Sequence, residues 1–226
     1  MVRDLPELWD RVRVFRDRRH AGEVLARMLE GRLPAGTRVL AIPAGGVPVA
    51  AEVARALRLP LDVAVVSKVT PSWNSEVGYG AVAFDGRARL DARAQARLGV
   101  DDREAREGTR RTLEKVRRRV EALREGLGPV VAPGDTVLLV DDGLASGTTM
   151  AVAVEALRDA GAGRIVVAVP TGSASAVRRL EPLVEEVDCA NVRSGWSFAV
   201  ADAYETWSDV EEEAVREALA RGRAAP

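Results

Sequence analysis

The sequence predicts an α/β protein with a mostly parallel central sheet flanked by helices. Short apolar runs typical of buried strands alternate along the chain with longer segments whose apolar residues recur at helical spacing. Such alternation favours βαβ units, in which the strands of a sheet run parallel. The chain has 226 residues, 47% of them hydrophobic, which is enough for a sizeable core. We therefore expect residues 1–226 to form a single domain.

The N-terminal half contains one clear βαβ unit. Apolar residues at helical spacing predict a first helix, which Gly31 and Pro34 end. Glycine and proline then separate shorter apolar runs. The elements expected in order are a helix at 21–29, a strand at 38–42, a loop at 43–46, a helix at 47–57 and a second strand at 61–66.

A long loop at residues 70–80 follows, rich in turn residues but carrying Trp73 and Tyr79. Together with residues 81–84 and the turn after them, it is expected to form a surface hairpin with both aromatic side chains packed beneath it.

The C-terminal half continues the alternation of helices and strands. A long charged helix carries one apolar stripe, and Ser208 with Glu211 predicts a capping box for the last helix. The elements expected in order are a helix at 101–126, a strand at 136–140, a helix at 148–160, a strand at 165–169, a helix at 173–184, a strand at 186–190 and a helix at 211–219. A parallel sheet binds ligands at the carboxyl ends of its strands. The loops after Ile42, Val66, Val140 and Val169 should therefore share one crevice.

Composition excludes several classes of protein. Cys189 is the only cysteine and His20 the only histidine, which excludes an intrachain disulfide and a zinc site of the usual kind. Any bound metal should therefore have oxygen ligands. The first residues lack the apolar core of a signal peptide, and no apolar run reaches membrane-spanning length. We expect a cytoplasmic protein without a membrane partner.

Arginine supplies nearly all of the positive charge, since Lys68 and Lys115 are the only lysines. This bias is compatible with thermophily and equally with a coding preference. The basic residues at 110–119 would suit an RNA-binding stripe. The glutamates among them favour a solvated helix with internal ion pairs instead, and the net charge of -1 points to no nucleic-acid partner.

The most informative segment is residues 136–150, TVLLVDDGLASGTTM. A buried strand leads directly into Asp141 and Asp142, whose carboxylates suit two vicinal ribose hydroxyls. Small residues and Gly147 then allow backbone amides to approach an anion at the start of a helix. Hydroxyl side chains add further donors to these amides. The pattern predicts a phosphoribose site, whereas the alternative is an ordinary turn with a helix cap.

The spacing of residues argues against three other classes of functional loop. A Walker A loop needs a lysine after its second glycine, and here Thr148 follows Gly147. A serine hydrolase elbow needs Gly-x-Ser-x-Gly, which Ser146 does not satisfy. Gly161 and Gly163 follow a predicted helix and lead into a strand, unlike a dinucleotide fingerprint.

Residues 136–150 closely resemble the signature of the type I phosphoribosyltransferases, which bind 5-phosphoribosyl-1-pyrophosphate (PRPP). The resemblance implies that Asp141 and Asp142 bind the ribose and hold Mg²⁺ directly or through water. It implies a 5′-phosphate site at residues 145–149 (Ala145, Ser146, Gly147, Thr148 and Thr149). It implies a pyrophosphate site at residues 44–46 (Ala44, Gly45 and Gly46) with Lys68. Residues 70–80 match the mobile loop of the family, with Lys68 and Glu76 as catalytic candidates.

This resemblance implies a Mg²⁺-dependent pentosyltransferase that transfers the phosphoribosyl group to a nitrogen acceptor, such as a nucleobase, and releases pyrophosphate. The acceptor would lie under a small hood formed by the N-terminal residues and residues 192–226, whose aromatic side chains are expected to be mostly core. Members of the family are often dimers, so the resemblance allows a homodimer without fixing the oligomeric state.

Two positions depart from the family. Ala44 stands where relatives usually carry arginine or lysine, and Ala145 stands where enzymes of 6-oxopurines carry an aspartate. The second departure disfavours hypoxanthine and guanine as acceptors. The segment is more similar to adenine-type members and, with Gly143, most similar to a group of predicted phosphoribosyltransferases whose acceptor is not established. The first leaves an alternative open: a regulatory protein that senses PRPP or a nucleotide without transferring it.

Overall fold

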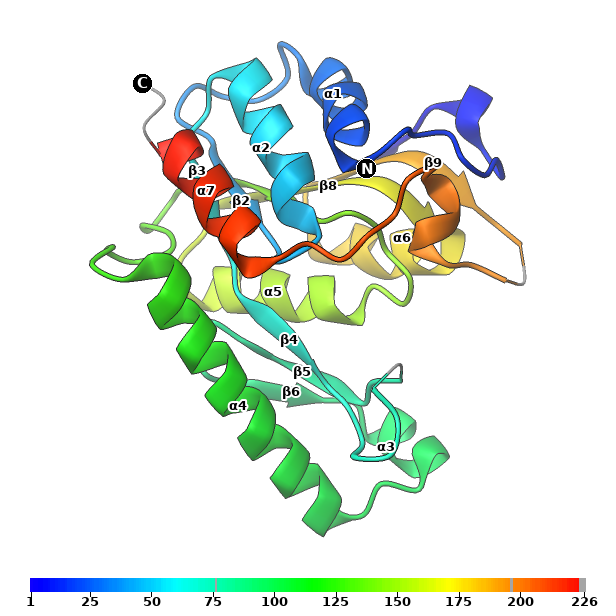
Figure 1. Cartoon of the computed structure of the whole chain (residues 1–226), viewed down its shortest axis with the longest axis vertical. Helices are drawn as coiled ribbons and strands as arrows, with labels where there is room; N and C mark the ends of the chain where they lie inside the picture. The colour runs from blue at the N-terminus through cyan, green and yellow to red at the C-terminus, as the bar shows by residue number, and fades with distance from the viewer. Residues whose placement is uncertain (76, 196, 224–226) are drawn as a thin grey trace.

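The computed structural model describes residues 1–75, 77–195 and 197–223. Its centre is a sheet of six strands, all parallel, which confirms the predicted α/β class (Figure 1). In spatial order the strands are β1 (Val2–Arg3), β9 (Glu186–Arg193), β8 (Arg164–Ser173), β7 (Thr136–Val140), β2 (Arg38–Ala41) and β3 (Leu61–Val63).

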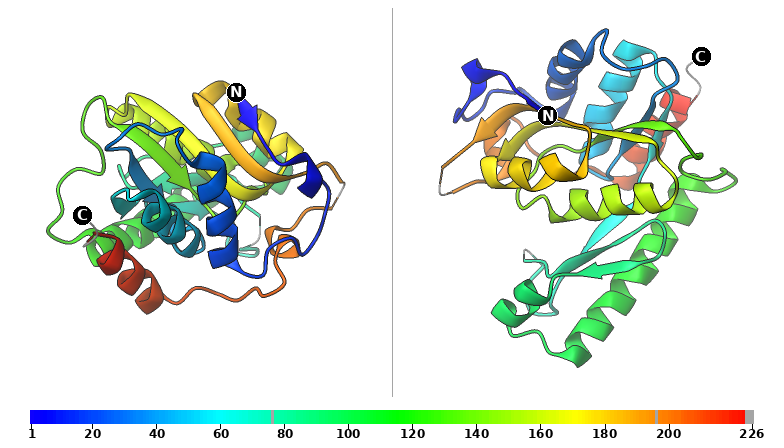
Figure 2. Two further views of the ribbon diagram at one scale, coloured as in Figure 1. Left: turned by 90° about the horizontal axis from the view of Figure 1, so that it is seen from above. Right: turned by 180° about the vertical axis from the view of Figure 1, so that it is seen from behind.

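Helices cover both faces of this sheet. On one face lie α1 (Arg18–Leu29), α2 (Gly46–Leu57) and α7 (Glu212–Arg223), and on the other lie α5 (Thr148–Asp159) and α6 (Ala174–Leu180) (Figures 1 and 2). Side chains of a strand alternate between the faces, so Leu138 and Val140 join the first core while Val137 and Leu139 join the second. Apolar residues on both sides of β7 therefore hold its carboxyl end in place.

A second sheet includes strands on both sides of the turn in the predicted surface hairpin, but its extent was not predicted. It is antiparallel and consists of β4 (Val66–Val69), β5 (Gly80–Ala83) and β6 (Ala88–Leu90). With α3 (Ala92–Leu98) and α4 (Asp102–Arg124) it lies beyond α5, away from the central sheet (Figure 2). The strand predicted at 61–66 is wrong as a single element, because β3 ends at Val63 and β4 begins at Val66 in the other sheet. The apolar run is continuous there, and both linking residues are buried, so hydropathy gives no sign of the break.

The C-terminal elements also differ from their predicted bounds. Strand β8 continues to Ser173, and a 3-10 turn, η2 (Glu181–Leu183), replaces the end of the predicted helix 173–184. Because α7 begins at Glu212, Ser208 lies outside its N-cap position and the predicted capping box does not form.

A segment near the N-terminus runs beside a segment from the C-terminal part of the chain. Strand β1 pairs with β9, and η1 (Pro6–Leu8) follows it. Residues 13–16 then run alongside residues 202–206, after η3 (Val200–Ala203), with Phe15 and Tyr204 forming a parallel bridge. Among the described residues, no helix combines the length and the apolar character needed to cross a bilayer.

Candidate functional site

The acid pair lies where β7 ends. Asp141 and Asp142 follow Val140 directly, at the carboxyl edge of the sheet and between the neighbouring strands β2 and β8. The backbone N–H of Asp142 donates to Oδ1 of Asp141 at 2.9 Å. Burial, and then the neighbouring charge of Asp142, raise the pKa of Asp141 well above its usual value. Burial also raises the pKa of Asp142, against the lowering effect of Arg18.

The loop after the acid pair is held by β8. Leu144 exchanges backbone hydrogen bonds with Thr171 and Ser173, both at 2.9 Å, and Oγ of Ser173 donates to the carbonyl of Ala145 at 2.8 Å. The structure thereby fixes the course of the loop that the sequence assigned to the 5′-phosphate.

That loop ends at the start of α5. Gly147 has a φ of 72°, a left-handed conformation that favours glycine, and α5 begins at the next residue. Ala145 and Ser146 are exposed, whereas Thr148 and Thr149 are partly buried. The hydroxyl of Ser146 lies 3.2 Å from that of Thr148. Exposed amides and hydroxyls at a helix N-terminus form the kind of environment that binds phosphate.

The glycine loop at residues 43–46 packs directly on the acid pair. A Cβ atom built on Gly45 would lie 2.0 Å from Oδ2 of Asp142, and one on Gly46 would lie 2.8 Å from the carbonyl oxygen of Val140. Only glycine allows the backbone to approach this closely. The peptide bond between Pro43 and Ala44 is cis. The structure therefore brings the predicted ribose and pyrophosphate segments into contact.

Lys68 is placed differently from the expectation. It lies inside β4, opposite Ala81 of β5, and its side chain is exposed. The expectation that it follows the end of a central strand is wrong, because β4 belongs to the antiparallel sheet. A Cβ on Gly78 would lie 2.4 Å from the Cγ of Lys68, so the loop at residues 70–80 passes close to this lysine. Glu76 lies outside the described residues.

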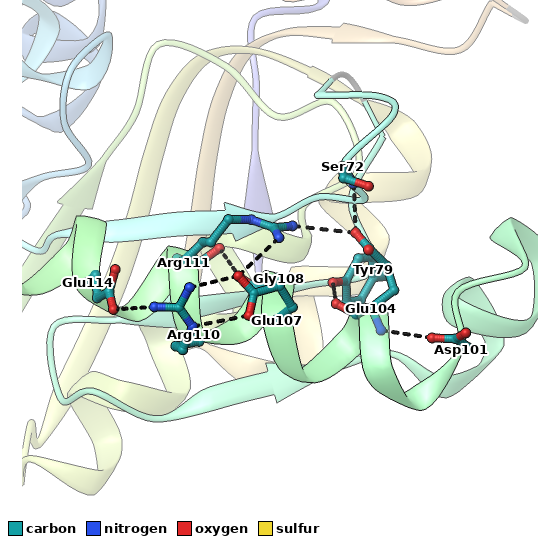
Figure 3. Close-up of polar contacts among 10 residues, drawn as sticks. Ser72, Tyr79, Asp101, Glu104, Glu107, Gly108, Arg110, Arg111 and Glu114 are labelled. Carbon is teal, nitrogen blue, oxygen red and sulfur yellow. Dashed lines mark hydrogen bonds and ion pairs between the residues drawn. The ribbon is translucent and has the colours of Figure 1, made fainter.

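The loop at residues 70–80 is anchored to α4 (Figure 3). The backbone N–H of Ser72 donates to Oε1 of Glu104 at 2.7 Å, and the hydroxyl of Tyr79 donates to the Glu104 carbonyl at 3.3 Å. Tyr79 is buried as predicted, whereas Trp73 is 59% exposed, so the prediction that both aromatics pack beneath the loop is half right.

The basic helix α4 carries the ion pairs that its sequence predicted. Arg110 contacts Glu107 and Glu114, each at 2.7 Å, and Arg111 reaches Glu104 at 3.4 Å (Figure 3). These contacts neutralise much of the positive charge on this part of the helix.

Sequence reasoning missed Arg18, which lies beside the acid pair. Its Nε donates to Oδ2 of Asp142 at 2.8 Å, and its guanidinium carbon lies 3.7 Å from the centre of the Trp207 ring. The hydroxyl of Tyr204 donates to the Asp142 carbonyl at 2.6 Å. The aromatic residues of the tail were expected to be mostly core. Tyr204 is buried, but Trp207 is 39% exposed and Phe198 only partly buried, so this expectation is wrong for most of those described; Trp196 lies outside the described residues. No local pattern links Arg18 to an aspartate 124 residues away.

The donor set of this site fits a hard cation. Two adjacent carboxylates provide oxygen ligands, and Mg²⁺ typically binds one or two protein carboxylates, with substrate phosphates and water completing its shell. Throughout the described residues, no cluster of three or more metal-binding side chains occurs. Asp141 and Asp142 are thus suited to share a cation with a phosphorylated substrate.

Comparisons with known proteins agree with this geometry. The chain is 34% identical over 204 residues to "Putative phosphoribosyl transferase Rv0571c" of Mycobacterium tuberculosis, covering 90% of this chain and 46% of that protein. Strain CDC 1551 of the same organism has a protein, MT0597, that matches equally. The chain therefore spans about half the length of these relatives.

A solved structure and a family model complete the comparison. The crystal structure of TT1426 from Thermus thermophilus is 37% identical and superposes with a TM-score of 0.74, covering 92% of this chain and 98% of that one. The family model described as the phosphoribosyl transferase domain matches residues 35–205. The resemblance seen in the signature segment is thereby confirmed, and the chain belongs to the phosphoribosyl transferase family.

Proposed function

We propose that this protein transfers the 5-phosphoribosyl group of PRPP to a nitrogen atom of a small acceptor and releases pyrophosphate. One observation carries the proposal: the acid pair contacts the glycine loop at residues 43–46 on one side and leads into the loop at residues 143–149 on the other. PRPP has the same order of groups, with a ribose between two phosphate ends.

Each segment then has a defined task. The amides at the start of α5 and the hydroxyls of Ser146, Thr148 and Thr149 bind the 5′-phosphate. Asp141 and Asp142 accept hydrogen bonds from the ribose hydroxyls. The amides of residues 44–46 bind the pyrophosphate. Glycine at 45 and 46 lets this loop lie directly against Asp142 and Val140, next to the ribose.

Mg²⁺ fits this site, with Asp141 and Asp142 as the residues that hold it directly or through water. Bound there with PRPP, it would supply charge neutralisation to the departing pyrophosphate.

The reaction replaces one bond at C1 of the ribose. The acceptor nitrogen forms a bond to C1 and releases its proton to water, while the bond from C1 to the pyrophosphate oxygen breaks and both of its electrons leave with pyrophosphate. A cation-like C1 is open to attack by water, so a cover that excludes water is useful. The loop at residues 70–80 with Lys68 and Glu76 is our candidate for this cover, and the first residues with residues 192–226 are our candidate acceptor hood.

The acceptor class proposed is a nucleobase or a related small molecule. Ala145, which replaces an acidic residue of 6-oxopurine enzymes, argues against hypoxanthine and guanine. A cytoplasmic location, a single functional domain over residues 1–226 and a homodimer belong to the same proposal. Light scattering after size exclusion tests the dimer.

Calorimetric titration with PRPP, with and without Mg²⁺, tests the first step. Pyrophosphate release is then followed with a panel of nucleobases and small amines. We expect Mg²⁺-dependent binding and release that requires one class of acceptor. The matched control is the double variant Asp141→Asn and Asp142→Asn, which should fold but bind PRPP weakly. Failure of the wild-type protein to bind PRPP would contradict the proposal, and binding without release from any acceptor would favour a regulatory sensor.

A further inference from the structure

Arg18, the first residue of α1, makes three contacts, one with the acid pair and two with residues 207 and 208 near the C-terminal end. Its Nε donates to Oδ2 of Asp142 and its Nη1 donates to the carbonyl of Ser208, both at 2.8 Å. Its guanidinium also stacks on Trp207 at 3.7 Å. The side chains of Arg18 and Asp142 are only 11% and 15% exposed, so their contact is largely shielded from water. A shielded, charge-assisted contact of this kind is stronger than an exposed ion pair.

Arg18 also lies at the end of a paired segment that we call the terminal strap, residues 13–18 and 202–208. The backbone N–H of Phe15 donates to Ala203 at 3.0 Å, and the N–H groups of Glu205 and Thr206 donate back to the carbonyls of Phe15 and Arg16 at 2.8 and 2.9 Å. The strap contacts the acid pair at two points. The Tyr204 hydroxyl bonds to the carbonyl of Asp142, and Arg18 bonds to its carboxylate.

These contacts determine how Asp142 can point. Its backbone N–H is bonded to Asp141, its carbonyl oxygen to Tyr204 and its Oδ2 to Arg18. A carboxylate fixed at its own oxygen and at both sides of its backbone loses little further freedom when a ligand binds. The same Oδ2 lies 2.0 Å from where a Cβ of Gly45 would stand, so Arg18 brings positive charge next to a loop that has no cation of its own.

We propose that Arg18 is a positioning residue, which orients Asp142 for the ribose of PRPP and fastens the terminal strap to that carboxylate. The inference rests on the proposed function for the identity of the ligand. It follows that the orientation of the Asp142 carboxylate and the stability of the hydrogen bonds within the strap both depend on the Arg18 side chain. Lysine cannot replace it, because a single ammonium lacks the planar fork that reaches two acceptors while stacking on a ring.

The test compares Arg18→Lys with Arg19→Lys. Arg19 is the next residue of α1, its side chain is 68% exposed and it pairs with Glu52, so it serves as a matched control for charge and position. Calorimetry measures the PRPP affinity of each variant, and thermal unfolding confirms that each is folded. We expect Arg18→Lys to weaken PRPP binding by about tenfold to a hundredfold, and Arg19→Lys to leave it unchanged.

Hydrogen exchange on the free proteins gives the second readout. The amides of Glu205 and Thr206 are bonded across the strap, so Arg18→Lys should speed their exchange by about tenfold or more, whereas Arg19→Lys should not. Wild-type affinity in Arg18→Lys, or wild-type exchange at these two amides, would overturn the inference. If the wild-type protein binds no PRPP, the proposed function falls, and the exchange measurement, which needs no ligand, decides whether Arg18 fastens the strap.

Discussion

The acid pair lowers the stability of the fold, although we propose that it is needed for ligand binding. Burial raises the pKa of Asp141 well above its usual value, and the charge of Asp142 adds to that effect. A carboxyl whose folded pKa exceeds its unfolded pKa costs stability when it is ionised. We interpret this cost as the price of holding two acceptors side by side for a diol.

Asp141→Asn should therefore stabilise the protein at neutral pH. Asparagine keeps the Oδ1 acceptor for the N–H of Asp142 but removes one of two neighbouring charges. We expect a gain of about 1 to 2 kcal/mol in the free energy of unfolding at pH 7. The gain should shrink as the pH falls below the raised folded pKa of Asp141 and vanish below its unfolded pKa, where the wild-type carboxyl is neutral in both states. Urea unfolding across this pH range measures it.

The control is Asp209→Asn, which changes an exposed aspartate to the same amide. It should leave the free energy of unfolding within about 0.5 kcal/mol of the wild type. A loss of stability in Asp141→Asn at neutral pH would contradict our account of the acid pair.

Gly45→Ala tests the contact between the glycine loop and the acid pair. A Cβ at this position would stand 2.0 Å from Oδ2 of Asp142, so the carboxylate must move. We expect PRPP affinity to fall by about tenfold or more, because Asp142 leaves the orientation that we propose for ribose binding. The control is Gly128→Ala, where an added Cβ meets nothing within 4 Å. Equal PRPP affinity of the two variants, measured by calorimetry, would show that the loop does not constrain the site.

Site residues that are neighbours in the sequence could be predicted, whereas contacts between residues far apart in the sequence could not. Asp141, Asp142 and residues 145–149 occupy one motif, so strand, turn and helix start could be placed from their order alone. The contact of Arg18 with Asp142 joins residues 124 positions apart, and an arginine after a helix cap looks like any solvated residue.

Among the secondary-structure elements, one buried cluster joins β3, α4 and α7. Asp62 of β3 accepts hydrogen bonds from Arg124 of α4, at 2.8 Å, and from Arg223 of α7, at 2.6 Å. Burial acts to raise the pKa of Asp62, but the bonds from both arginines outweigh it and hold the pKa below its usual value. The cluster ties the central sheet to the helix of the antiparallel unit and to the last helix.

Asp62→Asn should loosen this connection. The buried guanidinium of Arg124 and the partly exposed one of Arg223 would lose their counter-charge, and we expect a loss of about 3 kcal/mol in the free energy of unfolding at pH 7. Because the folded pKa is lowered, the contribution of Asp62 is present above its unfolded pKa and is lost as the pH falls through the folded value. Denaturant unfolding should therefore show a difference in the free energy of unfolding between the wild type and Asp62→Asn that is large at pH 7 and smaller in acid.

An exposed pair of α7 provides the comparison. Glu217 and Arg221 are 60% and 72% exposed, so Glu217→Gln should change stability by less than about 0.5 kcal/mol. A similar effect of Asp62→Asn and Glu217→Gln would contradict the role given to the buried cluster.

The elements themselves were predictable wherever hydrophobic period and length agreed. The stripe of α4 and the buried run of β7 are examples, and both were placed within two residues of their bounds. The run at residues 61–66 was not resolved into two strands, because residues buried in either sheet have the same composition. Strand β6 and helix α3 are short and carry mostly polar or small residues, so their periodicity gave no signal.

For the whole molecule, the parallel central sheet followed from the alternation of elements, but the antiparallel unit and the terminal strap did not. Parallel crossovers are favoured by the chirality of the chain, so local order predicts them. The pairing of Phe15 with Tyr204 depends instead on the final position of both ends of the chain. The sequence alone therefore gives no basis for predicting that these two segments pair.

The arrangement of the whole fold predicts where PRPP should protect the backbone. The glycine loop at residues 43–46, residues 143–149 and the terminal strap all lie near the carboxyl end of β7. Hydrogen exchange with Mg²⁺ and PRPP should slow in these three segments together. At the amino ends of the strands, where the N–H of Gly134 donates to Gly161 before β7 and β8 begin, the exchange rates should not change. The double variant Asp141→Asn and Asp142→Asn should show little protection anywhere. Protection confined to the amino ends of the strands would place the ligand there and contradict the proposed site, because at those ends a parallel sheet offers no helix N-terminus to a phosphate.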